Sequence, residues 1–114
     1  MPSRSVRIRQ WQENRENKPR KPGNVYIVKL SETLYKVGKT LDLRRRLSQF
    51  RTTNIGADYV WSAYVVDMDA AENELHTCLW YRKAEREMFR LKPKDIRRAK
   101  RIVHPFRVRD AYPA

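Results

Sequence analysis

The stretch VYIVKLSETLYKVGKTLDLRRRLSQF, from Val25 to Phe50, determines how the fold is expected to begin. Residues 24–30 and 34–38 are rich in β-branched and aromatic side chains, which favour β-strands. The polar residues 31–33 between them are short enough to form a turn. We therefore predict an antiparallel hairpin, which would be the first part of a β-sheet.

A helix is predicted to follow the hairpin at once. Thr40 is a residue type that caps helix N-termini, so the helix should begin at Leu41 or Asp42. Its apolar residues recur at the i, i+4, i+7 spacing of one helical face: Leu43, Leu47 and Phe50. The three consecutive arginines at positions 44–46 would point about 100° apart around the helix. Only one of them can therefore face the sheet.

The rest of the chain adds one strand and two helices. Residues 59–66 are the most apolar segment and are predicted to form a third strand. Asp69 is expected to cap a second helix, and residues 86–91 are expected to be a short extended piece. A basic helix should begin at Pro93 or Asp95. This order predicts an α+β fold, with a small three-stranded antiparallel sheet flanked by helices, plus a basic C-terminal helix.

Positive charge dominates the composition and is concentrated at both ends. The 114 residues include 26 lysines and arginines against 13 acidic residues, so the formal net charge is +13. Residues 1–22 and 92–110 are strongly basic, whereas residues 23–91 are nearly balanced. We predict a flexible basic arm over 1–22, a folded domain over 23–91, and a basic helix and tail over 92–114. Such a protein attracts polyanions, of which nucleic acid is the foremost.

The composition also excludes several classes of protein. Cys78 is the only cysteine, which excludes an internal disulfide and a cysteine-based zinc cluster. The apolar runs are far shorter than the ~18 residues of a membrane span. Residues 1–24 lack the apolar core of a signal peptide. We therefore expect a soluble intracellular or virion-associated protein that does not enter a membrane.

Four sites in the sequence together resemble the GIY-YIG nuclease superfamily. Asn24-Val25-Tyr26 resembles its first motif, and Lys36-Val37-Gly38 resembles its second. Arg46 stands ten positions after Lys36, where the family has an arginine, and Glu72 stands where it has a metal-binding glutamate. The resemblance covers about residues 23–91. Asn24 and Lys36 depart from the usual glycine and tyrosine, and the family's late asparagine has no counterpart; the lysine is typical of a branch common in phage and virus proteins.

This resemblance implies a metal-dependent DNA endonuclease, which would nick DNA with low sequence specificity. The catalytic residues that it implies are Tyr26, Lys36, Arg46 and Glu72. Glu72 would also bind Mg²⁺ or Mn²⁺, because one carboxylate can hold such an ion if water and substrate phosphate complete its shell. Arg46 would donate hydrogen bonds to phosphate oxygens. His76 and Gly38 are accessory candidates, His76 as a second ligand or proton shuttle and Gly38 for backbone geometry.

The group that accepts the proton from water stays open. Tyr26 stands where the resemblance places a residue that holds or activates the attacking water. Lys36 could accept a proton only if burial beside positive groups such as Arg46 lowered its pKa from ~10.4 towards neutrality. A metal-bound hydroxide is the third alternative. The sequence does not decide between the three.

Structural roles compete with these functional ones. Asp69 and Glu72 have the spacing of a capping box, which would explain Glu72 as an end-of-helix residue. Glu74 is a rival for the metal ligand. Trp80 and Tyr81 are expected to pack beneath the last strand.

The remaining basic candidates are assigned to nucleic-acid binding. They are Lys39, Arg44, Arg45, Arg51, Arg97, Arg98, Lys100 and Arg101. The expected partner is DNA, bound by a monomer or a weak homodimer. The runner-up function is a noncatalytic DNA-binding or packaging protein with a retained nuclease fold, and a ribosomal-type RNA binder is supported by charge alone.

Overall fold

The predicted hairpin is confirmed and lies at the centre of the fold. The computed structural model describes residues 19–53 and 56–108. In it, strand β1 (Gly23–Lys29) pairs antiparallel with β2 (Tyr35–Thr40). The register places Tyr26 opposite Gly38. Because side chains alternate across a strand, this register decides which residues of the hairpin share a face of the sheet.

The described sheet has five antiparallel strands rather than the predicted three, in the order β3-β1-β2-β5-β4. The additional strands are β3 (Asp58–Val65), β4 (Lys83–Glu85) and β5 (Met88–Phe89). The third strand was predicted, whereas β4 and β5 were missed because two or three residues are too few to show an alternating pattern. They form because β5 pairs with the outer edge of β2. The α+β class is confirmed.

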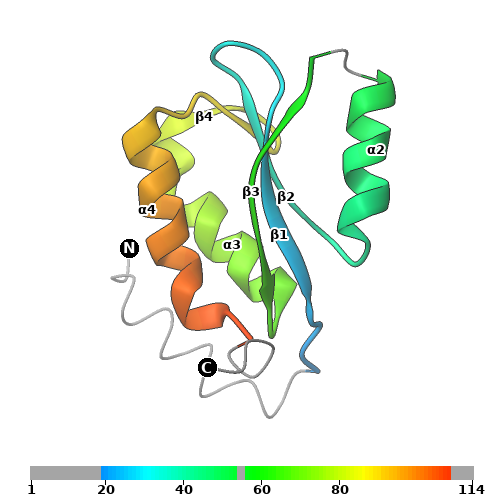
Figure 1. Cartoon of the computed structure of the whole chain (residues 1–114). Helices are drawn as coiled ribbons and strands as arrows, with labels where there is room; N and C mark the ends of the chain where they lie inside the picture. Colours follow the sequence, from blue (N-terminus) through cyan, green and yellow to red (C-terminus); the bar gives the residue numbers. More distant parts are fainter. Residues whose placement is uncertain (1–18, 54–55, 109–114) are drawn as a thin grey trace.

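Helices cover both faces of this sheet, so the described chain has three layers (Figure 1). The helices are α2 (Leu43–Thr53), α3 (Met68–Cys78) and α4 (Pro93–Val103). Figure 1 shows α3 and α4 on one side of the sheet and α2 alone on the other. The larger core lies on the α3 and α4 side, where Val25, Val37 and Leu75 are fully buried. A smaller cluster joins Tyr26 and Val28 to the apolar residues of α2.

Helix α2 begins two residues later than its predicted cap. The Thr40 hydroxyl accepts a hydrogen bond from the backbone N–H of Asp42 at 3.1 Å. The carboxylate of Asp42 in turn accepts from the N–H of Arg45 at 3.0 Å, which is the bond of an N-cap residue. Asp42 therefore caps α2, and Thr40 holds the link between β2 and the helix.

Helix α3, by contrast, begins earlier than predicted, and this changes the interpretation of Glu72. Asp67 is the N-cap, and its carboxylate accepts from the N–H of Ala70 at 3.3 Å. The expected cap, Asp69, lies within the first turn of the helix. The capping-box explanation of Glu72 is therefore wrong, since Glu72 lies beyond the position that such a box would use.

The segment after α3 leads to the predicted basic helix. Two short 3₁₀ turns, η1 (Trp80–Arg82) and η2 (His104–Phe106), stand on either side of β4, β5 and α4. Helix α4 contributes Ala99, Ile102 and Val103 to the same core as α3. Trp80 and Tyr81 are largely exposed, so the prediction that they pack beneath the last strand is wrong.

Some predictions fall outside the described residues. Most of the basic arm assigned to 1–22 and the end of the tail, residues 109–114, lie there. The domain boundaries therefore stay a prediction. In residues 19–53 and 56–108, no helix is both long and apolar enough to cross a membrane.

Candidate active site

The four predicted catalytic residues come from four different elements and meet in one neighbourhood. Tyr26 lies on β1, Lys36 on β2, Arg46 on α2 and Glu72 on α3. The charges of Arg46 and Glu72 both act on the Tyr26 hydroxyl, and so does that of Glu87. Lys36 joins this group through Glu87, with which it forms an ion pair. The fold thus gathers residues that are up to 46 positions apart in the sequence.

Tyr26 is buried between the hairpin and α2. Its ring packs edge-on against Phe50 of α2, with centroids 5.8 Å apart. A Cβ atom on Gly38 would lie 2.5 Å from the tyrosine oxygen, so the ring covers this glycine closely. Burial raises the pKa of Tyr26 to about 12, although Arg46 lowers it and the carboxylates of Glu87 and Glu72 raise it. The hydroxyl is therefore protonated at neutral pH.

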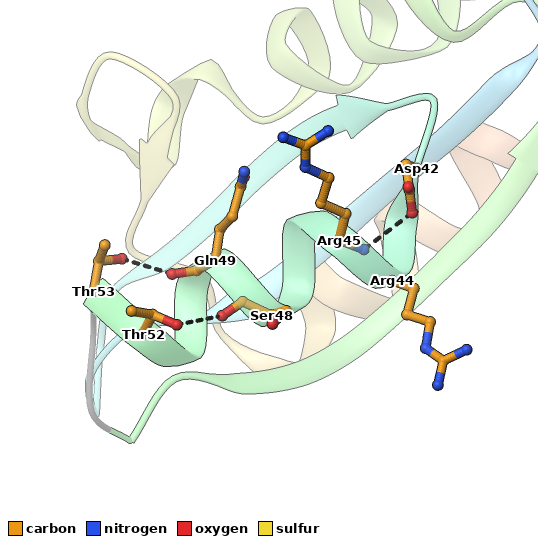
Figure 2. A pocket seen from close by; sticks show the side chains of 7 residues that line it. All are labelled: Asp42, Arg44, Arg45, Ser48, Gln49, Thr52 and Thr53. Atoms are coloured by element: carbon orange, nitrogen blue, oxygen red, sulfur yellow. Dashed lines mark hydrogen bonds between the residues drawn. The ribbon is translucent and has the colours of Figure 1, made fainter.

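Arg46 differs from the two arginines before it. It is the one of the three whose charge lowers the pKa of Tyr26. Arg44 and Arg45 instead border a hollow of about 490 Å³ on the outer side of α2. In Figure 2 their guanidinium groups point away from each other. All three arginines are exposed, and Arg46 is the one whose charge acts on Tyr26.

Lys36 has a negative neighbour where its role as a base would need positive ones. Its ammonium group lies 2.5 Å from a carboxylate oxygen of Glu87, and both side chains are partly exposed. The hydrogen bond from Lys36 is the main cause that lowers the pKa of Glu87. The ammonium group of Lys36 is therefore held in an ion pair, and the geometry favours Lys36 as a hydrogen-bond donor in this site.

Glu87 is a member of the site that the sequence did not identify. It lies in the turn between β4 and β5, and its backbone carbonyl accepts from the N–H of Val37 at 3.1 Å. Its place therefore depends on the pairing of β5 with β2, which the short strand pattern could not predict. In the sequence, Glu87 is one of two acidic residues in the segment EREMFR, residues 85–90. Such a pattern is equally typical of a solvated surface.

Glu72 is a buried carboxyl in the middle of α3. Its side chain lies 3.7 Å from the ammonium group of Lys39, which also contacts Asp69 at 2.5 Å. Burial raises the pKa of Glu72, while the charges of His76 and Lys39 lower it. Lys39 was predicted to contact nucleic acid, but its charge is directed towards these two carboxylates.

His76 lies one turn after Glu72, as expected, and its orientation is defined by a backbone contact. Its Nε2 atom lies 2.9 Å from the carbonyl oxygen of Val37. A carbonyl only accepts hydrogen bonds, so Nε2 carries a proton and donates to Val37. The ring also packs edge-on against Phe89, with centroids 5.1 Å apart. These two contacts define the orientation of the His76 ring.

Glu74, the other candidate for the metal ligand, has different neighbours from Glu72. It is buried, and one of its carboxylate oxygens accepts from the thiol of Cys78 at 3.3 Å. Cys78 is part of the core between the helices and the sheet. Of the two glutamates, Glu72 is the one whose charge reaches Tyr26.

The carboxylate of Glu72 could bind a cation such as Mg²⁺ only weakly by itself, and within the described residues it is not part of a closed metal centre. Among residues 19–53 and 56–108, no three His, Cys, Asp or Glu side chains are grouped to hold a metal ion. Mg²⁺ is commonly bound through one or two carboxylates, with water and substrate phosphate as its other ligands. The buried oxygen atoms of Glu72 match that requirement.

The other predicted nucleic-acid contacts lie on the surface of two helices. Arg44, Arg45 and Arg51 are exposed on α2, and Arg97, Arg98, Lys100 and Arg101 are exposed on α4. The two helices cover opposite faces of the sheet (Figure 1), so these residues form two separate basic surfaces. Their binding role stays a prediction.

Comparison with known families identifies the chain. The T5orf172 domain matches residues 17–104, which is most of the sequence and all of the sheet and helices described above. The chain therefore belongs to the T5orf172 domain family. No match emerged among curated proteins or solved structures.

This membership corrects the assignment to the GIY-YIG superfamily, for which no family match exists. That assignment rested on two three-residue motifs together with the positions of Arg46 and Glu72, and each motif departs from the pattern at its first position, Asn24 and Lys36. A tyrosine opposite a glycine in a hairpin is also a packing arrangement in its own right, as Tyr26 and Gly38 show. T5orf172 is a phage-related domain associated with nuclease-like and DNA-binding domains, which is compatible with a DNA-related function.

Proposed function

We propose that this chain is a metal-dependent DNA endonuclease that hydrolyses phosphodiester bonds with little sequence specificity. One observation supports the proposal above the others. The fold brings a buried glutamate and an arginine from two separate elements close enough to a tyrosine on a third that both charges act on its hydroxyl. Burying Glu72 beside other charges costs stability, and a binding surface for DNA gains nothing from a carboxylate.

The side chains supply complementary functions for this reaction. Arg46 donates hydrogen bonds to phosphate oxygens and stabilises the negative charge that develops on them. The Tyr26 hydroxyl stays protonated, so it orients the water or phosphate as a neutral hydrogen-bonding group. Nδ1 of His76 accepts the proton from the attacking water, since Lys36 is paired with Glu87.

Glu72 is the residue that would hold the divalent cation, Mg²⁺ or Mn²⁺. Such an ion neutralises charge on the phosphate oxygens when it is bound. Lys39 competes for the same carboxylate, because it lies 3.7 Å from Glu72. Its contact with Asp69 provides the ammonium group with an alternative partner.

A monomer with one such site cuts one strand at a time. A nicked product is therefore the expected outcome on duplex DNA, and a double-strand break requires two binding events or a dimer.

The alternative function is a noncatalytic DNA-binding or packaging protein. The ion pairs Lys36–Glu87 and Lys39–Asp69 favour it, because they neutralise charges that catalysis would use. Both functions share DNA as the partner, so binding alone does not separate them.

Relaxation of supercoiled plasmid separates the two functions. The wild-type protein should convert plasmid to the nicked form with Mg²⁺ or Mn²⁺ and not with a chelator. Replacing Arg46 by alanine should slow nicking by about 10²–10³-fold, and Glu72→Gln should strongly reduce the nicking that Mg²⁺ or Mn²⁺ supports. A protein that shifts DNA on a gel but never nicks it would leave only the binding function.

Matched controls use residues of the same type outside the site. Glu85→Gln removes an exposed carboxylate on β4, and Arg90→Ala removes an exposed arginine that contacts Thr33. Both variants should nick at the wild-type rate. If Glu72→Gln nicks as fast as Glu85→Gln, Glu72 is not the metal ligand.

A further inference from the structure

Two neighbouring aromatic residues, Trp80 and Tyr81, are exposed on the surface of this small protein. Trp80 is 66% exposed and Tyr81 is 47% exposed, and both belong to the turn η1. Tryptophan is on average one of the more buried residues because of its large apolar area. Neither ring is a member of the two apolar cores of the described chain. Packing therefore does not explain why both residues are aromatic.

Tyr81 is held in place by a buried carboxylate. Its hydroxyl donates to Asp95 at 2.8 Å, and the same carboxylate accepts from Nε of Arg82 at 3.0 Å and from the N–H of Lys92 at 2.8 Å. Asp95 is only 1% exposed. The turn is thus fixed to the start of α4 before any ligand arrives, which lowers the entropy lost on binding.

Positive charge surrounds these rings. The guanidinium group of Arg82 lies 5.2 Å from the centroid of Tyr81, and that of Arg98 lies 5.9 Å from it. Helix α4 continues the basic surface with Arg97 and Lys100, which are exposed. The one carboxylate in contact with the group, Asp95, is buried and paired. The outward surface is therefore aromatic and cationic at once.

A cationic surface with a free indole ring matches one kind of ligand best. The phosphates of nucleic acid bind the arginines and lysines, and a base stacks on the aromatic ring. The bases of duplex DNA are already stacked on one another, so only an unpaired base can use Trp80. An acidic protein surface would satisfy the charges but would have no comparable use for a flat exposed ring.

We propose that Trp80, beside the Tyr81–Arg82–Arg98 group, stacks on an unpaired base of single-stranded DNA or of a single-stranded segment within a duplex. This inference rests on the proposed function and names its substrate more closely. Base stacking is tolerant of sequence, which agrees with low sequence specificity. Trp80 follows closely after α3, the helix that contains Glu72, so the two residues come from adjoining elements.

Binding measured in chelator, without cleavage, tests this inference. Fluorescence anisotropy would compare a labelled oligodeoxythymidylate with a blunt duplex of equal length. We expect Trp80→Ala to weaken binding of the single strand by about 5- to 100-fold, while binding of the duplex changes less than about twofold. Trp80→Phe, which keeps a ring, should restore most of the affinity.

The matched control is Tyr59→Ala. Tyr59 is 50% exposed on β3, at the opposite edge of the sheet from β4. This variant should bind both oligonucleotides as the wild type does. If Trp80→Ala does not weaken single-strand binding, or weakens duplex binding equally, the inference is overturned, and a protein partner becomes the better explanation of the exposed ring.

The outcomes also separate this inference from the proposed function. If the wild type nicks plasmid but Trp80→Ala binds the single strand as tightly as the wild type does, the proposed nuclease function stands and the stacking site is overturned. A protein that binds neither oligonucleotide overturns both.

Discussion

At the scale of single residues, Tyr26 and Gly38 form the most constrained pair of the candidate site. They are directly opposite each other on β1 and β2. The tyrosine ring lies over the glycine, where a side chain would occupy the space of the ring. The position of the Tyr26 hydroxyl therefore depends on the absence of a side chain on the neighbouring strand.

Replacing Gly38 by alanine should displace Tyr26. The new Cβ would lie 2.5 Å from the tyrosine oxygen and 2.7 Å from Cζ, so the buried ring must move. We expect a loss of about 1–3 kcal/mol in the free energy of unfolding, measured by urea denaturation. A double-mutant cycle provides the control, because Gly38→Ala should cost much less when Tyr26 is already alanine. Equal costs in the two backgrounds would contradict the packing explanation.

The pKa of Tyr26 predicts how stability depends on alkaline pH. The folded pKa of about 12 lies above the ordinary value of 10.0, so the folded state binds this proton more tightly than the unfolded state. This contribution is complete below pH 10 and is lost as the pH rises to 12. Two pH units correspond to about 2–3 kcal/mol. Tyr26→Phe should lack this loss, and denaturation at several pH values would show whether the two proteins differ.

At the scale of elements, α3 brings Glu72 and His76 close to β2. Its position is determined at both ends. Asp67 caps its first turn, and the N–H of Met68 donates to the carbonyl of Lys21 at 2.8 Å. The contact between His76 and Val37 ties the last turn of the helix to β2. A change at the start of α3 therefore affects the site through the helix as a whole.

Two nearby aspartates should differ in their effect on α3. Asp67→Ala removes the N-cap and should cost about 1 kcal/mol of stability. Asp69→Ala removes a partly exposed ion pair with Lys39, which should cost less than about 1 kcal/mol. Thermal denaturation of the two variants side by side would test the assignment. A larger loss for Asp69→Ala would return the cap to the residue that the sequence had indicated.

At the scale of the whole molecule, charge is the property that we expect to govern the proposed encounter with DNA. The net charge of +13 is distributed over several surfaces, including the exposed arginines of α2 and α4. Three of the 13 acidic residues, Asp69, Glu72 and Glu87, each have a lysine beside them in the candidate site. The exposed arginines and these ion pairs therefore lie in different parts of the protein.

Binding to duplex DNA should depend steeply on salt. If six to ten phosphates are contacted, affinity should fall by about 10³–10⁵-fold between 50 and 200 mM salt. Arg45→Ala should reduce the slope of log K against log salt by about 1, whatever the sequence of the DNA. Glu85→Gln is the control and should not reduce the slope. A binding constant that changes little with salt would contradict a phosphate-based interaction.

Most of the secondary structure follows from local sequence. The hairpin, the third strand and the three helices have apolar patterns long enough to show their period, because burial of one face repeats every two or every 3.6 residues. Helix starts were displaced by two residues at Asp42 and Asp67, since several polar residues near a helix end can act as the cap. The strands β4 and β5 have too few residues to show any period.

The residue types of the candidate site were also available from the sequence, but their arrangement was not. Tyr26, Arg46 and Glu72 were named from the resemblance to the GIY-YIG superfamily, and the sequence by itself determined the strong positive charge and the helix that separates Arg46 from Arg44 and Arg45. Only the tertiary structure placed Glu87 beside Lys36, bound His76 to the backbone of β2, and left Trp80 in solvent. The physical reason is that the first two contacts join residues 39 to 51 positions apart. The exposure of Trp80 depends on how the other elements pack around it. Such relations are created by the packing of elements, for which local patterns contain no information.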